Sequence, residues 1–229
     1  MAQDFSQCLD YFASKRPPVM LTDQATIKAG RLRALCYTGF AVLHSGVTRT
    51  PLYSAQRLSR GDLLAGKGQA RTNKFFADAR LPRAERAELD DYKNSGYDRG
   101  HMAPAADSAN PTVMAQSFSL ANMAPQSREN NRKAWASVEK ATRRYVERAD
   151  GDVYVITGPA FGAQHGTIGP NRVWVPGHFF KLVYDPQAKR AWAHWVENVD
   201  DARPGPPISY RELVRRTGIE FLPGAVLQP

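Results

Sequence analysis

The residues with the clearest potential for chemistry lie at positions 97–104, in the run Tyr-Asp-Arg-Gly-His-Met-Ala-Pro. Arg99 carries a permanently charged, planar guanidinium that suits a phosphate, and His101 can accept a proton near neutral pH. Gly100 lets the backbone turn sharply between them. A base for water, a cation for developing charge and a metal ion are what hydrolysis of a phosphodiester needs. The helix expected downstream can offer an oxygen ligand for a hard metal.

Two further segments follow in a recognisable order. Residues 121–126 read Ala-Asn-Met-Ala-Pro-Gln, and the helix expected over residues 131–149 carries Asn131 and Glu139. Together with Asp-Arg-Gly-His at positions 98–101, this pattern resembles the DNA/RNA non-specific endonuclease family, the sugar-non-specific ββα-metal nucleases. The resemblance covers residues 35–196 and includes the segments 40–45 and 51–53.

The resemblance implies a role for each matching residue. His101 would be the general base that takes a proton from the attacking water, and Arg99 would steady the phosphate or the transition state. Asn131 would be the single direct protein ligand of Mg²⁺, with waters at the remaining positions and Mn²⁺ able to substitute. Glu139 would hold one of those waters.

Asn122 and Arg71 complete the candidate site, and Asn122 and Glu139 each also have a structural interpretation. The resemblance implies that Asn122 lies in or beside the ligand shell of the metal, whereas a turn residue before Pro125 is the structural alternative. An arginine that precedes the motif also contributes in the family, and Arg71 is its nearest match in a loop that aligns poorly. Glu139 has an alternative as an exposed charge on the helix.

Helix geometry distinguishes Asn131 from its neighbour Asn130. At about 100° per residue, Asn131 lies about 80° from Glu139 around the helix axis, while Asn130 lies about 180° away. The separation along the axis is about 12 Å, and helical side chains lean toward the amino end. We therefore expect Asn131 to share a face with Glu139, with water filling the remaining distance, as suits the sparse protein ligation of Mg²⁺.

Composition indicates a basic globular chain whose positive charge suits either a nucleic-acid partner or solubility. The 229 residues contain 31 Lys and Arg against 22 Asp and Glu, a net charge of +9, and 42% are hydrophobic. No window approaches the roughly 18 apolar residues of a spanning helix. Excess positive charge suits a polyanion, although a basic surface can also serve solubility. The basic residues expected to contact the phosphate backbone of a nucleic acid lie on or near the long helix, at Arg128, Arg132, Lys133, Lys140 and Arg143.

The two cysteines, Cys8 and Cys36, are too far apart for a CxxC motif. A disulfide that joins the amino-terminal segment to the first strand is the favoured interpretation, with two buried free thiols as the alternative. The start at Met1 shows no signal peptide. A disulfide would then indicate an exported chain whose signal has been removed, so we expect an extracytoplasmic location, periplasmic or secreted, rather than the cytosol.

The elements expected around these residues predict an α+β fold of the ββα-metal nuclease type, with a largely antiparallel central sheet flanked by helices. Residues 1–229 would form a single nuclease domain with a polar lead-in over 1–34 and a Pro-rich tail over 203–229. Turns are expected at 158–159, 176–177 and 185–186, and a loop at 59–74. Strands are expected at 35–43, 52–58, 153–157, 172–175, 178–184 and 190–196, and further helices at 82–92 and 209–217.

These observations favour a Mg²⁺-dependent, sequence-independent endonuclease that hydrolyses DNA and RNA. One alternative is a catalytically silent nucleic-acid-binding relative, which the intact His101, Arg99 and Asn131 argue against. Another is a phosphodiesterase restricted to nucleotides or single strands. A homodimer and an inhibitor protein are further expected partners.

Overall fold

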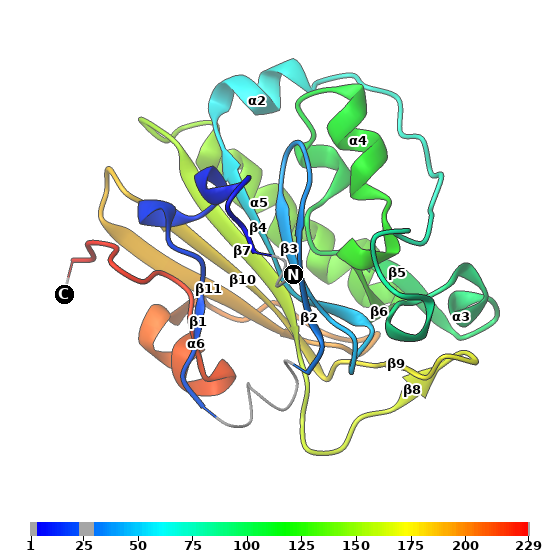
Figure 1. The fold of residues 1–229 in the computed structure, drawn as a ribbon. Coiled ribbons are helices and arrows are strands. Elements are labelled where there is room, and N and C mark those ends of the chain that lie inside the picture. The colour runs from blue at the N-terminus through cyan, green and yellow to red at the C-terminus, as the bar shows by residue number, and fades with distance from the viewer. Residues whose placement is uncertain (1–3, 23–29, 229) are drawn as a thin grey trace.

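A seven-stranded antiparallel sheet, in the order β12-β11-β10-β7-β4-β3-β2, runs through the molecule (Figure 1). The structure, a computed structural model, describes residues 4–22 and 30–228. The strands of the sheet are β2 (Leu32–Cys36), β3 (Ala41–Ser45), β4 (Thr50–Leu58), β7 (Val153–Ala160), β10 (His178–Asp185), β11 (Arg190–Glu197) and β12 (Ile208–Ser209). The predicted α+β class and largely antiparallel central sheet are confirmed.

Shorter elements surround this sheet. Six short strands form three two-stranded pairs, β1 (Val19–Met20) with β13 (Ile219–Glu220), β5 (Tyr97–His101) with β6 (Met123–Ser127), and β8 (Thr167–Ile168) with β9 (Val173–Trp174). The α-helices are α2 (Arg60–Ala65), α3 (Leu89–Tyr92), α4 (Pro111–Ser117), α5 (Ala136–Val146) and α6 (Tyr210–Thr217). The remaining helical turns are η1 (Leu9–Tyr11), η2 (Ala13–Lys15), η3 (Arg83–Glu85), η4 (Ala105–Asp107), η5 (Leu120–Asn122) and η6 (Asn130–Trp135).

Both faces of the sheet are covered, as the alternating directions of the side chains along β10 show. Phe180 and Leu182 join the core that the amino-terminal segment and α6 cover. Phe179 and Val183 point the other way, into clusters formed with η6 and α5. Successive residues of a strand face opposite sides, so this near-continuous apolar strand supplies two cores at once. The side that carries η6 and α5 also carries the candidate site.

The long helix runs from residue 128 to residue 146, and its second part is the regular helix α5. Its first part, η6 (Asn130–Trp135), is π-helical. Trp135 and Val138 are buried against the sheet, as the apolar stripe predicts. The expected end at residue 149 is three residues too late, since α5 ends at Val146.

The segment 35–43, expected as one strand, is the end of β2, a tight turn and the start of β3. The N–H of Tyr37 donates to the carbonyl of Phe40 at 2.9 Å, which closes the turn. The two rings stack with their centroids 4.4 Å apart, and both belong to the same core cluster as Leu35 and Val42. The turn is therefore as apolar as the strands, which is why the pattern concealed it.

Two other expected elements differ at their boundaries. The loop expected at 59–74 contains α2, because Ser59 and Asp62 form a reciprocal capping box over its first turn. The helix expected at 82–92 is two short turns, η3 and α3. They are separate because Glu88 is extended, with φ −114° and ψ 164°, and its N–H donates to the Asp91 carboxylate at 2.7 Å.

The expected turn at Gly158 and Pro159 lies inside β7. Strand β4 pairs with β7 only as far as Thr157, so beyond this residue one side of β7 is an edge. On its other side, Pro159 lies opposite Phe179 of β10. Proline has no N–H to donate, so it is tolerated in a strand at an edge position, where no neighbouring strand would accept that hydrogen bond. In the carboxyl-terminal tail, the expected helix is α6, which begins one residue later than predicted and is capped by Ser209.

The predicted disulfide between Cys8 and Cys36 is confirmed, with Cα atoms 5.7 Å apart. It joins the turn before η1 to the end of β2. The segment expected as a polar lead-in is anchored by Phe5 and Phe12, which are buried against Tyr53 of β4. Across residues 4–22 and 30–228, none of the helices has the length and apolar character needed to cross a bilayer.

Candidate active site

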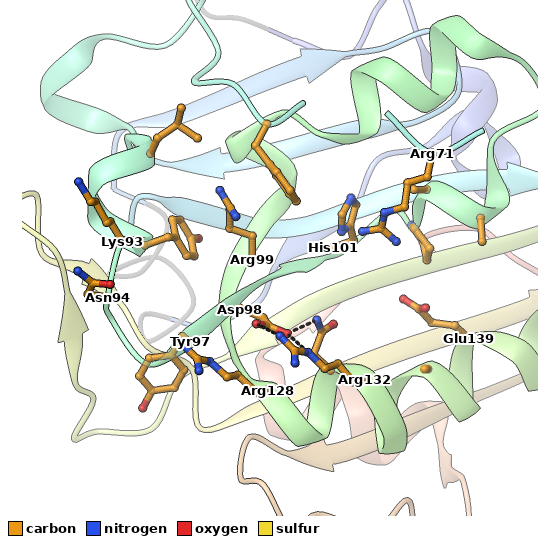
Figure 2. Close-up of a pocket in the computed structure, with 18 of the residues that line it drawn as sticks. Arg71, Lys93, Asn94, Tyr97, Asp98, Arg99, His101, Arg128, Arg132 and Glu139 are labelled. Atoms are coloured by element: carbon orange, nitrogen blue, oxygen red, sulfur yellow. Dashed lines mark hydrogen bonds and ion pairs between the residues drawn. The ribbon is translucent and has the colours of Figure 1, made fainter. Parts of the chain in front are cut away.

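A cleft of about 1010 Å³ lies where β5, the start of the long helix, α3 and the segment 71–75 meet (Figure 2). Five of the six residues predicted for the site line it: Arg71, Arg99, His101, Asn131 and Glu139. Figure 2 shows His101 between Arg99 and Arg71, with Glu139 on the helix opposite. The cleft therefore brings together side chains that are up to 68 residues apart in the sequence.

Strand β5 sets the positions of Arg99 and His101. Its antiparallel pairing places Arg99 opposite Pro125 and His101 opposite Met123 of β6, and residues two apart on a strand share a face. Gly100 points to the other face, where a Cβ atom would lie 2.2 Å from Oε1 of Gln126. The glycine is needed because β5 packs too closely on this glutamine to admit any side chain.

Asn122, the sixth predicted residue, does not line the cleft. It is fully buried, and its Oδ1 accepts from Ser54 Oγ at 2.8 Å and from the Ala103 N–H at 2.9 Å. Its Nδ2 donates to the carbonyls of Ala103 and Ser117, both at 2.9 Å. The backbone that follows His101 is thus held by this amide, which gives Asn122 a supporting position behind the cleft.

His101 is 8% exposed, and its Nε2 is buried without a hydrogen-bond partner among the described residues. Burial lowers the pKa of the imidazole to about 3, and the neighbouring positive charges of Arg71 and Arg99 add to the effect. The ring is neutral at physiological pH for this reason. A neutral imidazole is the form that can take a proton.

Asp98 orients the amide of Asn131. Nδ2 of Asn131 donates to Asp98 Oδ2 at 3.0 Å, which turns its Oδ1 away from the carboxylate. The same carboxylate holds Arg132 through two hydrogen bonds of 3.0 Å (Figure 2). Asn130 instead is buried and donates to the carbonyl of Glu197. Of the two adjacent asparagines, only Asn131 lines the cleft.

Glu139 is the acidic group on the helix side of the cleft. Burial raises the pKa of its carboxyl to about 7, and Asp107 acts in the same direction, while Lys181, Arg143 and Arg71 oppose the rise. Lys181 lies on β10 with 1% exposure, and its Nζ donates to Thr157 Oγ1 at 2.7 Å. Sequence reasoning missed this buried lysine, although a Lys within the apolar run 179–184 is the signal that could have found it.

The basic residues expected on the helix divide into two groups. Arg128 and Arg132 line the cleft, and so does Lys93 of the segment after α3. The other three expected cations do not line it. Among them, Lys133 pairs with Glu129, Arg143 pairs with Asp107, and Lys140 is exposed outside the cleft.

The donor set fits a sparsely ligated hard cation. Within the described residues, no group of three or more His, Cys, Asp or Glu side chains is placed to hold a metal. Of the predicted site residues, Asn131 offers its Oδ1 and Glu139 its carboxylate to the cleft, and neither group accepts a hydrogen bond from the described residues. Oxygen donors of this kind suit Mg²⁺, which keeps several waters and takes few protein ligands.

The fold and the cleft agree with the comparison to known sequences. Residues 22–227 match the sequence profile of the DNA/RNA non-specific endonucleases. The chain belongs to this family. The resemblance inferred from the motif at 98–101 is therefore confirmed, and so is the ββα-metal nuclease fold.

Relatives of the chain include mitochondrial Nuclease 1 of Schizosaccharomyces pombe, 37% identical over 63% of the chain and 49% of the relative. Mitochondrial Nuclease EXOG of Danio rerio is 35% identical over 82% of the chain and 60% of the relative. The chain thus spans about half the length of the curated relatives it matches. A crystal structure of the EndoG/EndoGI complex, concerned with the mechanism of EndoG inhibition, matches with a TM-score of 0.76 and 25% identity over 87% of this chain and 91% of that one.

The expected extracytoplasmic location is wrong, because these relatives of the chain are named as mitochondrial nucleases. The inference rested on the Cys8–Cys36 disulfide, which is present. A disulfide reports that two thiols met under oxidising conditions and does not by itself specify export.

Proposed function

We propose that the chain is a metal-dependent endonuclease that hydrolyses DNA and RNA without sequence preference. One observation carries the proposal: a neutral imidazole, two arginines and two oxygen donors converge in a single cleft of a DNA/RNA non-specific endonuclease fold. We also propose that the whole chain forms one nuclease domain, since the family match extends over residues 22–227.

His101 acts as the general base in this proposal. Because Nε2 is buried, Nδ1 is the nitrogen that takes the proton from a water molecule in the cleft. The oxygen of that water forms a bond to phosphorus, and the bond from phosphorus to the leaving oxygen breaks. Arg99 and Arg71 bind the non-bridging oxygens and stabilise the extra negative charge of the transition state.

Asn131 and Glu139 would hold the metal. The amide oxygen of Asn131, oriented by Asp98, would be the direct ligand, and Glu139 would accept hydrogen bonds from waters on the metal. When bound, Mg²⁺ or Mn²⁺ supplies electrostatic stabilisation of charge on the phosphate and the leaving oxygen.

The cations along the cleft support recognition of the nucleic-acid backbone. The side chains of Arg128 and Lys93 make no ion pair or hydrogen bond with the described residues, and both line the cleft. Contacts to phosphates give affinity without reading the bases. This supports activity on both DNA and RNA.

Cleavage of supercoiled plasmid and of a structured RNA, each with Mg²⁺ and with excess EDTA, tests the proposal. We expect nicking and then linearisation of the plasmid, degradation of the RNA, and no cleavage in EDTA. His101→Ala protein purified in parallel controls for contaminating nucleases. Binding without cleavage would contradict the proposal in favour of a silent relative, and cleavage of single strands or nucleotides alone would contradict the broad substrate range.

Two partners are proposed beyond the substrate. The structural neighbour is a nuclease in complex with EndoGI, and this likeness supports an inhibitor protein for the present chain. A homodimer stays a prediction, which sedimentation analysis of the purified protein would test.

A further inference from the structure

The two arginines beside His101 are held by aromatic rings. The guanidinium carbon of Arg99 lies 4.0 Å from the ring centroid of Phe75, and that of Arg71 lies 5.2 Å from the centroid of Phe118. The imidazole of His101 contacts both rings, with centroid separations of 5.8 Å and 5.1 Å. The same two rings therefore contact His101, Arg99 and Arg71, which in the proposed function activate the water and bind the phosphate.

Two other arginines of this region are held by carboxylates instead. Arg132 is bound by the Asp98 carboxylate and Arg143 by Asp107, each at 3.0 Å. The side chain of Arg99 makes no hydrogen bond or ion pair within residues 4–22 and 30–228, and Arg71 donates only through Nε, to Asn73 at 2.7 Å. Of the five N–H groups of a guanidinium, all five of Arg99 and four of Arg71 remain available.

The aromatic pair is itself fixed by the fold. Phe118 is fully buried after α4, and its ring meets that of Phe75 edge to face at 4.9 Å. The segment that carries Phe75 is joined to this region by two backbone hydrogen bonds of Phe76, one to the Phe118 carbonyl at 3.3 Å and one from the Leu120 N–H at 2.8 Å. The rings can therefore orient the groups that lie on them.

We propose that Phe75 and Phe118 position Arg99, Arg71 and His101, so that both guanidiniums are immobilised while their N–H groups stay free for phosphate. The inference rests on the proposed function. A carboxylate would fix an arginine by occupying its N–H groups and would repel the incoming phosphate. A ring face attracts the cation through its quadrupole and leaves the edge of the guanidinium open. Phe75, which lines the cleft and touches Arg99 and His101, is the residue on which the arrangement depends most.

Replacement of Phe75 tests this proposal. Phe75→Leu removes the ring face, and we expect kcat/KM for cleavage of an oligonucleotide duplex to fall by about 3- to 30-fold, the equivalent of one cation–π contact. Phe75→Tyr keeps the ring and should stay within about 2-fold of the wild type. The matched control is Phe76→Leu, since Phe76 is 40% exposed and contacts none of the three groups, and it should have no effect. Thermal melts verify that each variant is folded.

A double-mutant cycle separates positioning from a general structural role. In an Arg99→Ala background, Phe75→Leu should lose most of its effect, because the group that it positions is gone. An undiminished loss in that background would overturn the proposal.

A second readout does not depend on activity. Side-chain NMR relaxation of the Arg99 Nε–H group should show a rigid guanidinium in the free wild-type protein and a mobile one in Phe75→Leu. Equal mobility in both would also overturn the proposal. If the wild-type protein cleaves no nucleic acid, the proposed function fails, and the relaxation measurement still decides whether Phe75 holds the arginine.

Discussion

Replacement of Asn130 by alanine and replacement of its neighbour Asn131 by alanine should affect different properties of the protein. Asn130 is buried, accepts from Gln126 Nε2 at 2.8 Å and donates to the carbonyl of Glu197. Asn131 faces the cleft and makes its side-chain contact with Asp98, which keeps Arg132 as a partner. We therefore expect Asn130→Ala to cost stability and Asn131→Ala to cost catalysis.

The magnitudes follow from these contacts. Asn130→Ala leaves two polar groups unpaired, the buried amide of Gln126 and the partly buried carbonyl of Glu197, at about 1–3 kcal/mol each. About 4 kcal/mol in total corresponds to a fall in Tm of about 8–16 °C for a chain of this size. Asn131→Ala should change the free energy of unfolding by less than about 1 kcal/mol. Loss of the direct metal ligand should remove about 4 kcal/mol of transition-state stabilisation, a rate effect of about a thousandfold.

Thermal melts and single-turnover cleavage, at a temperature where both variants are folded, measure the two effects, and titration calorimetry with Mg²⁺ measures metal binding. If Asn130→Ala slows the folded enzyme more than Asn131→Ala does, our assignment of the metal ligand is wrong. Equal and mild rate effects from both would place the metal elsewhere in the protein.

Further changes probe single groups. His101→Ala should slow cleavage by about 10²- to 10⁴-fold in single-turnover kinetics while DNA affinity and Tm stay near the wild-type values; a residual rate above a tenth would refute its role as the base. Glu139→Ala, which removes a contact to metal-bound water, should cost about 10- to 100-fold in the same assay. Burial lowers the pKa of His44 to about 4, so the unfolded state binds more protons between pH 4 and pH 6.5 and stability falls as the pH drops through this window. In urea titrations, His44→Gln should therefore reduce the stability lost between pH 7 and pH 5 by about 2 kcal/mol, and an unchanged loss would argue against a neutral buried imidazole. Reduction of the Cys8–Cys36 disulfide, which closes a loop with a sequence separation of 28, should lower stability by about 3–4 kcal/mol, measured by melts with and without reductant; two alkylatable thiols in oxidised protein would contradict the bond.

The sequence predicted the groups that face the cleft better than the groups that support it. His101, Arg99, Asn131 and Glu139 could be found because their side-chain chemistry and order form a motif that is visible without the fold. Asn122 belongs to the same motif, yet it is buried behind the cleft with its amide fully hydrogen-bonded. A sequence pattern records that a residue type recurs at a spacing and does not record whether its side chain meets substrate or backbone.

The supporting groups depend on tertiary contacts. Phe75 lies in a segment with no regular secondary structure, so no periodicity marked it, and Phe118 reads as one more core residue. Lys181 interrupts an apolar strand, but the negative charges that stabilise its ammonium group, those of Glu139 and Asp107, come from other elements. The turn between β2 and β3 was concealed for a related reason, because Tyr37 and Phe40 are core residues themselves.

The π-helical turns over Asn130–Trp135 make the position of Asn131 depend on the number of residues between it and the sheet-packed part of the helix. A π-turn holds one more residue than an α-turn, so deletion of an exposed residue such as Lys133 would let the segment relax to a regular helix with both of its ends kept in register. Trp135 is buried against the sheet and would stay in place, and Asn131 would keep nearly its direction, because the deletion removes only the extra residue of the π-turn. A second deletion would find no extra residue and would rotate Asn131 by about 100° around the helix axis. The site should therefore tolerate the loss of one exposed residue from this segment but not the loss of two, a constraint on the length of the segment that is separate from the side chains it carries.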